Sequence, residues 1–180
     1  MYFKKLVGKK CYLSPMDVND AEKYTAWLND LEITSYLTLS ASLISVEGER
    51  KFLENAAMEH HYAIVDSATE ELIGNASLAD INHLHGTAEI GLFIGKKDCW
   101  GKGYGTEVME LLLDYGFAKL NLHNITLHVY SFNERAIRCY EKVGFKPAGR
   151  LREAFTLNRK KHDILIMDIL PDEFYDIYKG

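Results

Sequence analysis

The chain has 180 residues, of which 47% are hydrophobic and 26% charged, and its formal net charge is −5 at pH 7. This length and composition predict a single domain covering residues 1–180, with a core of its own. A negative charge without a basic stripe argues against nucleic acid as a partner. No apolar stretch approaches the roughly 20 residues that a membrane helix needs, so we expect no membrane association.

The N-terminal segment and the cysteines bear on location and on metal binding. MYFKKLVGKK lacks the apolar stretch of a secretory signal peptide, so we expect a cytoplasmic protein. Cys11, Cys99 and Cys139 are odd in number and contain no CxxC pair, which favours reduced thiols over disulfides or zinc. The seven histidines show no metal-ligand spacing either, so we expect no bound metal.

The first half of the chain changes from helical to strand periodicity. Apolar spacing predicts helices over 17–29 and 46–60, the second with Ser45 as a possible N-cap. The period then becomes two, which predicts an antiparallel meander over residues 62–66, 72–81 and 88–94.

The second half returns to helical spacing after a glycine-rich stretch. The elements expected there are a helix over 104–119, a strand over ITLHVYS, a helix from Asn133 to a stop at Gly144, and a hairpin of strands 148–157 and 162–170. The apolar face expected for the first helix consists of Val108, Leu111, Leu112, Tyr115 and Ala118. A strand, a helix and a further strand in succession predict one parallel pair in an otherwise antiparallel sheet. We therefore predict an α+β (mixed α/β) domain with a central sheet of six to seven strands and about four flanking helices.

The stretch WGKGYG, residues 100–105, links the third strand of the meander to the helix that follows. It fails the nucleotide P-loop pattern because Lys102 precedes Gly103, and it fails G-x-G-x-x-G because Thr106 occupies the third glycine position. Its amides, at the positive end of a helix, are suited to wrapping a diphosphate. The alternative is a tight turn that needs glycine only for a positive φ.

Two segments together resemble a known family. W-G-K-G-Y-G-T-E at 100–107 and N-E-R-A-I-R-C-Y-E-K-V-G-F at 133–145 resemble the paired acetyl-CoA motifs of the GNAT superfamily of N-acetyltransferases. LVGKKCYLSPMDVNDAEKYTAWLND resembles the opening of the ribosomal-protein N-terminal acetyltransferases, and LLLDYGFAKLNL onward also resembles spermidine acetyltransferases. The family's usual Gln or Arg at the start of the first motif is Trp100 here, which removes one polar contact.

The resemblance implies acetyl-CoA as co-substrate. The diphosphate would lie on the amides of the loop, which are those of Gly101, Lys102, Gly103, Tyr104, Gly105 and Thr106. The pantetheine arm would pair with the strand before the loop, at Phe93 and Ile94, so the parallel pair must splay to admit it. Asn133 would hydrogen-bond the same arm, and its plain alternative is to cap the following helix.

The resemblance also implies catalytic roles. Tyr140 matches the proton donor to the departing thiolate, although a tyrosine on an apolar helix face is otherwise a core residue. Glu89 is the first candidate for the base, ahead of Glu153 and His128, and its alternative is a solvated carboxylate. Cys139 lies next to Tyr140, but nothing in the sequence indicates an activated thiol that would carry an acetyl group.

The expected reaction is direct attack of a primary amine on the thioester, with a protein N-terminus or a polyamine-like small amine as acceptor. The alternatives are an aminosugar or aminoglycoside N-acetyltransferase and a non-catalytic acyl-CoA sensor. Aromatic residues in the tail LPDEFYDIYKG suggest a possible homodimer.

Overall fold

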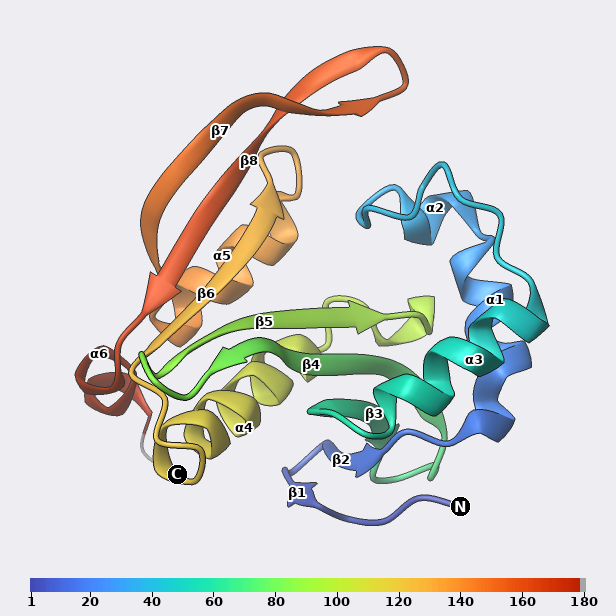
Figure 1. Cartoon of the computed structure of the whole chain (residues 1–180), viewed down its shortest axis with the longest axis horizontal. Helices are drawn as coiled ribbons and strands as arrows, with labels where there is room; N and C mark the ends of the chain where they lie inside the picture. Colours follow the sequence, from blue (N-terminus) through green and yellow to red (C-terminus); the bar gives the residue numbers. More distant parts are fainter. Residues whose placement is uncertain (179–180) are drawn as a thin grey trace. The chain divides into compact units, whose positions relative to one another are not determined.

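The apolar runs form eight strands of one sheet in the computed structural model, in the order β1-β2-β3-β4-β5-β6-β8-β7 (Figure 1). The structure describes residues 1–178. The strands are β1 (Leu6–Val7), β2 (Cys11–Pro15), β3 (His61–Asp66), β4 (Leu72–Asn82), β5 (Thr87–Ile94), β6 (Asn124–Tyr130), β7 (Lys146–Leu157) and β8 (Lys160–Ile169). The helices are α1 (Ala21–Leu28), α2 (Leu31–Thr34), α3 (Val46–Ala56), α4 (Tyr104–Ala118), α5 (Glu134–Val143) and α6 (Pro171–Ile177), with 3₁₀ turns at Val18–Asp20 and Lys97–Cys99.

The chain forms two compact units. The first comprises Met1–Ser77 and Leu92–Val108, and the second comprises Leu78–Gly91 and Met109–Gly180. Strands β4 and β5 and helix α4 each contribute residues to both units.

The first unit is built on the antiparallel strands β1, β2 and β3, with α1 and α3 packed against each other. Its core includes the fully buried side chains of Tyr12, Tyr24 and Leu53. Ser45 caps α3 as predicted, because its hydroxyl accepts a hydrogen bond from the Gly48 amide over 3.1 Å. The helix predicted over 17–29 begins as a 3₁₀ turn, and α3 ends at Ala56, earlier than predicted.

The second unit contains the parallel pair. Strand β6 pairs with β8 in antiparallel register and with β5 in parallel register. The parallel register covers three pairs, Thr87↔Asn124, Ala88↔Ile125 and Glu89↔Thr126, although β5 runs on to Ile94 and β6 to Tyr130. The predicted parallel pair is therefore confirmed, and its pairing ends early, as a splayed pair requires.

The buried face of helix α4 agrees only in part with the predicted one, at Val108 and Leu112. The buried residues are Val108, Met109, Leu112, Leu113, Gly116 and Phe117, whereas Leu111 and Tyr115 are half-buried and Ala118 is exposed. A Cβ at Gly116 would lie 2.9 Å from Cδ1 of Ile125 in β6, so the helix approaches this strand closely at its glycine. The close approach turns the stripe that contains Gly116 toward the sheet.

Two counts were too low. Over residues 1–178 the sheet has eight strands rather than six or seven, because β1 and β2 show no clear alternation of apolar and polar residues. The described part of the chain contains six α-helices instead of the expected four, since α2 is one turn long and α6 falls in the tail that was expected to expose aromatics. Phe174 of that tail is only 1% exposed and packs against Phe117 within the chain.

Among residues 1–178, no helix combines the length and the apolar character needed to cross a membrane.

Candidate active site

The glycine loop joins the 3₁₀ turn Lys97–Cys99 to α4, which starts at Tyr104. Gly101 and Gly103 have φ values of +72° and +87°, in the region that favours glycine. A Cβ at Gly101 would meet no atom within 4 Å, so backbone conformation rather than crowding requires glycine there. The loop is thus a tight turn, and it leads directly into the first turn of α4, whose N–H groups lack intrahelical partners. These residues fit an anionic group such as a diphosphate.

Tyr104 anchors the end of the loop to the end of β3. Its hydroxyl donates a hydrogen bond to the carboxylate of Asp66, at the end of β3. This bond is the main reason why the pKa of Tyr104 is raised to about 12. Burial would raise the pKa of Asp66, but hydrogen bonds from Tyr104 and from the amides of Thr69 and Ala68 outweigh it, and the pKa is lowered.

Trp100 takes a structural position beside the loop. Its indole N–H donates to the carbonyl oxygen of Ile94 over 2.8 Å, and its ring lies edge-on to Tyr36. The tryptophan that replaces the family's polar residue therefore holds the end of β5.

The end of β5 shows which peptide groups face which edge. The Phe93 carbonyl lies 2.0 Å from where a Cβ would stand at Gly74, and the Gly95 amide donates to the Ile73 carbonyl over 2.9 Å. Both contacts are to β4. Because successive peptide groups of a strand alternate in direction, Ile94 and Leu92 present theirs to the opposite edge. The sequence analysis did not name Leu92, although the two-residue period gives it the same orientation as Ile94.

Glu89 and His128 meet on neighbouring strands of the second unit. Nδ1 of His128 lies 3.0 Å from Oε1 of Glu89, and the two side chains are 42% and 40% exposed. Both belong to the face of the sheet opposite to the buried residues Ala88, Ile125 and Leu127. The sequence suggested these two residues as alternative bases, whereas the structure places them in direct contact.

Asn133 caps α5 in the second unit. Its side-chain oxygen accepts from the Ala136 amide over 3.3 Å, and the helix ends at Gly144 with a φ of +114°, as predicted. The cap uses the oxygen of Asn133, whereas its NH₂ group supplies donors for other acceptors. Capping is therefore compatible with contact to a ligand.

Tyr140 lies on α5, with its ring 6.0 Å from that of Phe145 in an edge-to-face contact. The residue is partly exposed, and burial of the phenol raises its pKa. The phenol thus stays protonated at neutral pH, as a proton donor must.

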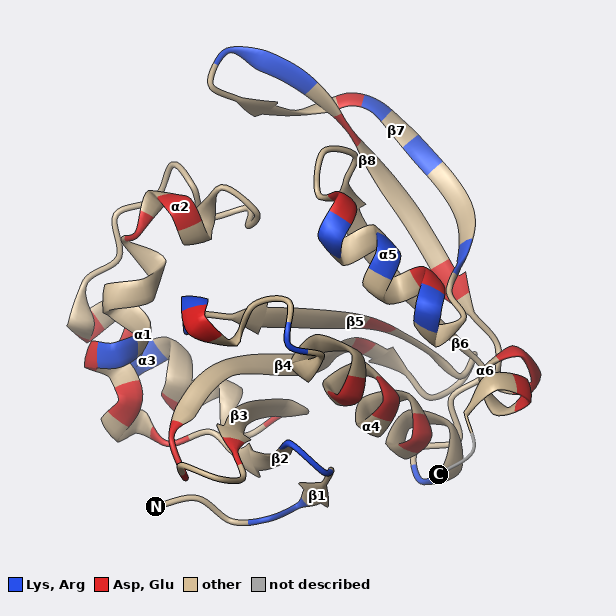
Figure 2. Cartoon of the chain, turned by 180° about the vertical axis from the view of Figure 1, so that it is seen from behind, with Lys and Arg blue, Asp and Glu red and all other residues tan. Residues whose placement is uncertain are grey.

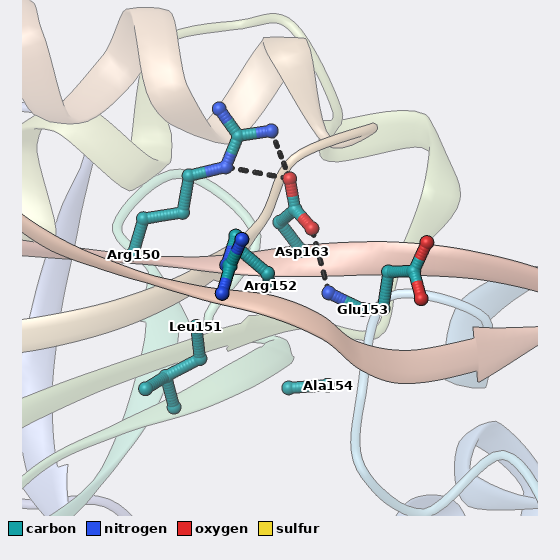
Figure 3. A pocket seen from close by; sticks show the side chains of 6 residues that line it. All are labelled: Arg150, Leu151, Arg152, Glu153, Ala154 and Asp163. Atoms are coloured by element: carbon teal, nitrogen blue, oxygen red, sulfur yellow. Dashed lines mark hydrogen bonds and ion pairs between the residues drawn. The ribbon is translucent and has the colours of Figure 1, made fainter.

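Glu153, a weaker candidate base, lines a hollow in the β7–β8 hairpin that contains no other residue predicted for catalysis or cofactor binding (Figure 3). The hollow measures about 870 Å³ and is lined by Arg150, Leu151, Arg152, Glu153, Ala154 and Asp163. The register of the hairpin shifts between Leu151 and Phe155, and Glu153 has a φ of +52°. Its amide donates to Asp163 over 2.7 Å, so the backbone of Glu153 shapes a β-bulge.

The predicted site residues divide between the units. The loop residues, Phe93 and Ile94 belong to the first unit, and Glu89, Asn133 and Tyr140 belong to the second. Within residues 1–178, no three His, Cys, Asp or Glu side chains are grouped as metal ligands would be.

A parallel strand pair whose pairing ends early, together with a glycine loop at a helix N-terminus, is typical of the class of acetyl-CoA-dependent N-acetyltransferases. Residues 10–146 match the family described as the acetyltransferase (GNAT) domain. The chain therefore belongs to the GNAT family and is an N-acetyltransferase, and the enzymes of this family use acetyl-CoA.

Individual relatives agree with this assignment. The chain is 33% identical to "Probable N-acetyltransferase YjcK" of Bacillus subtilis, over 93% of this chain and 98% of that protein. It is 38% identical to spermidine N(1)-acetyltransferase of Vibrio cholerae, over 62% of this chain and 64% of that protein. A crystal structure of spermidine N-acetyltransferase from Vibrio cholerae in complex with CoA and spermine superimposes with a TM-score of 0.83 at 29% identity, covering 93% of this chain and 99% of that one.

Proposed function

We propose that this enzyme transfers the acetyl group of acetyl-CoA to a primary amine of a small polycation of the polyamine class. Two similar proteins support the acceptor class, because one is named for spermidine and the other was solved with CoA and spermine. The single observation that carries the proposal is the pair formed by Glu89 and His128, which provides a proton acceptor next to a carboxylate.

An amine acceptor explains why such a pair is needed. A polyamine nitrogen with a pKa near ~10.4 is almost fully protonated at pH 7, and removing the proton costs about 4 to 5 kcal/mol. Deprotonating a protein N-terminus, whose pKa is near ~7.8, costs only about 1 kcal/mol at pH 7. In our proposal His128 takes the proton of the amine, and Glu89 orients the imidazole and stabilises its positive charge. The carboxylate also attracts the cationic acceptor.

The bound cofactor supplies the thioester whose acetyl group is transferred. In our proposal the amides of the loop from Gly101 to Thr106 hold its diphosphate, as the resemblance implied. The pantetheine arm lies along the edge of β5, where Ile94 and Leu92 offer peptide groups more directly than Phe93 does. The NH₂ group of Asn133 donates to the same arm.

Tyr140 completes the proposed reaction as the acid. A phenol whose pKa is raised holds its proton at neutral pH and can deliver it to the leaving sulfur. The remaining rate enhancement comes from holding the two reactants close together in the correct orientation. The neutral amine then attacks the thioester directly, without a covalent enzyme intermediate.

The proposal is tested by measuring the CoA thiol released from acetyl-CoA with spermidine, spermine, an aminoglycoside, an aminosugar nucleotide and short peptides as acceptors. We expect turnover with the polyamines, and turnover about 100-fold slower with the same acceptors when Tyr140→Phe replaces the wild type under equal conditions. Turnover with the peptides alone would indicate that the acceptor is a protein N-terminus and not a polyamine. Binding of acetyl-CoA without turnover on any acceptor would indicate the sensor alternative. A cytoplasmic location and a homodimer stay predictions.

A further inference from the structure

The turn between β1 and β2 contacts the glycine loop. The Lys10 ammonium donates a hydrogen bond to the Lys102 carbonyl over 2.6 Å. The same nitrogen lies 3.5 Å from where a Cβ would stand at Gly103 and 5.9 Å from the centre of the Tyr104 ring. A side chain from the N-terminal strands therefore reaches the loop that the resemblance assigns to the diphosphate.

The backbone of the same turn is fixed to the first turn of α4. The Lys10 amide donates to both carboxylate oxygens of Glu107, over 2.9 and 3.1 Å. Gly8 permits this contact, because a Cβ there would lie only 1.8 Å from Oε1 of Glu107. Lys10 thus holds the loop through its side chain and the start of α4 through its backbone.

The charge around this contact is mainly positive. Lys9, Lys10 and Lys102 line a cavity of about 610 Å³ together with Asp66, Ser67, Ala68 and Tyr104. The one carboxylate among these residues, that of Asp66, already accepts hydrogen bonds from Tyr104, Ala68 and Thr69. Figure 2 shows the same basic character on the segment that joins β1 to β2.

Peptide geometry gives the contact a consequence for binding. The C=O and N–H groups of one trans peptide point in opposite directions. When the Lys10 ammonium holds the Lys102 carbonyl, the Gly103 N–H of the same peptide therefore points away from Lys10. The hydrogen bond also keeps the Lys102 carbonyl oxygen from turning toward an anion bound at the Gly103 amide. Gly103, with its positive φ, could otherwise rotate through several conformations.

We propose that Lys10 is a positioning residue for the glycine loop, which pre-orients the Gly103 amide toward the diphosphate of CoA without contacting the cofactor itself. This inference rests on the proposed role of the loop. It assigns a role in cofactor binding to a residue that lies outside both motifs, 92 positions before Lys102.

The test is the affinity for CoA and for 3′-dephospho-CoA, measured by calorimetry for the wild type, Lys10→Met and Lys9→Met. Lys10→Met keeps an unbranched apolar stem of the same length as that of lysine and removes the ammonium donor, while Lys9→Met removes the same charge from the same cavity. We expect Lys10→Met to weaken both ligands equally, about tenfold, which corresponds to one hydrogen bond from a charged group. Lys9→Met should weaken them by less than about threefold.

Steady-state kinetics supplies a second readout. In Lys10→Met the KM for acetyl-CoA should rise about tenfold, whereas kcat and the KM for the amine stay near the wild-type values, because the reacting groups are untouched.

Three results would overturn the proposal. Equal effects of Lys9→Met and Lys10→Met would reduce the role of Lys10 to general electrostatics. A loss confined to CoA would indicate direct contact of Lys10 with the 3′-phosphate. An unchanged affinity in Lys10→Met would exclude any role of this contact in binding. Failure of the wild type to bind CoA would instead count against the proposed function as a whole.

Discussion

The imidazole of His128 and the carboxylate of Glu89 lie 3.0 Å apart on the neighbouring parallel strands β6 and β5. Their contact forms just where the parallel register ends, after the pair Glu89↔Thr126. A carboxylate that orients an imidazole is a common arrangement for a proton acceptor, and the first prediction depends on it.

Glu89→Gln and His128→Gln should each lower kcat/KM for spermidine about 100-fold at pH 7, because either change leaves the ammonium proton without its acceptor. The double variant should lose little more than either single one, since the two residues act together. The defect should shrink as the pH approaches that at which the amine is neutral in solution, ~10.4. Additive losses that persist at high pH would contradict a shared role.

Tyr140→Phe should lower kcat about 100-fold while the dissociation constant for acetyl-CoA stays within about twofold, because the change removes a proton donor and little packing. Tyr175→Phe is a matched control, since it removes the hydroxyl that donates to Asp114 on the surface. Single-turnover rates and calorimetry would separate the two quantities. A normal rate in Tyr140→Phe would remove this residue from the mechanism.

Gly103→Val should reduce the affinity for CoA by roughly 100-fold or more. A branched side chain disfavours the φ of +87° and displaces the loop amides from the ligand. Gly86→Val serves as the control. Gly86 lies in a different turn with a φ of +65°, so a valine there causes comparable backbone strain. Both variants should unfold at lower temperature, but calorimetry should show weak CoA binding only for Gly103→Val. Unchanged binding in Gly103→Val would refute the proposed role of the loop.

Asp66→Asn should lower the free energy of unfolding by about 1 to 3 kcal/mol at pH 7, because the carboxylate accepts hydrogen bonds from Tyr104, Ala68 and Thr69. The lowered pKa of Asp66 means that this stabilisation is present above its unfolded pKa near ~3.9 and is lost as the pH falls through the folded value. Urea titrations should therefore show a smaller difference between variant and wild type at pH 3 than at pH 7. A constant difference at both pH values would show that the ionised form has no special role.

Local patterns predicted the elements whose signals are short-range. The Ser45 cap, the left-handed Gly144 at the end of α5 and the two-residue period of β3 to β5 depend on nearest neighbours along the chain. The buried face of α4 was predicted only in part, because its orientation depends on how closely Gly116 approaches Ile125 in β6. Sequence periodicity gives the existence of a face, and packing chooses which residues turn inward.

The sequence by itself determined the family, through the glycine loop at 100–107 and the segment from Asn133 to Phe145, because the residues of each motif lie together in the chain. Tertiary structure alone decided which side chains meet across long separations. Glu89 with His128 and Lys10 with the Lys102 carbonyl are contacts set by strand pairing and loop geometry. The physical reason is that a hydrogen bond needs atoms within about 3 Å, and the pattern of a single chain does not fix such distances between remote residues.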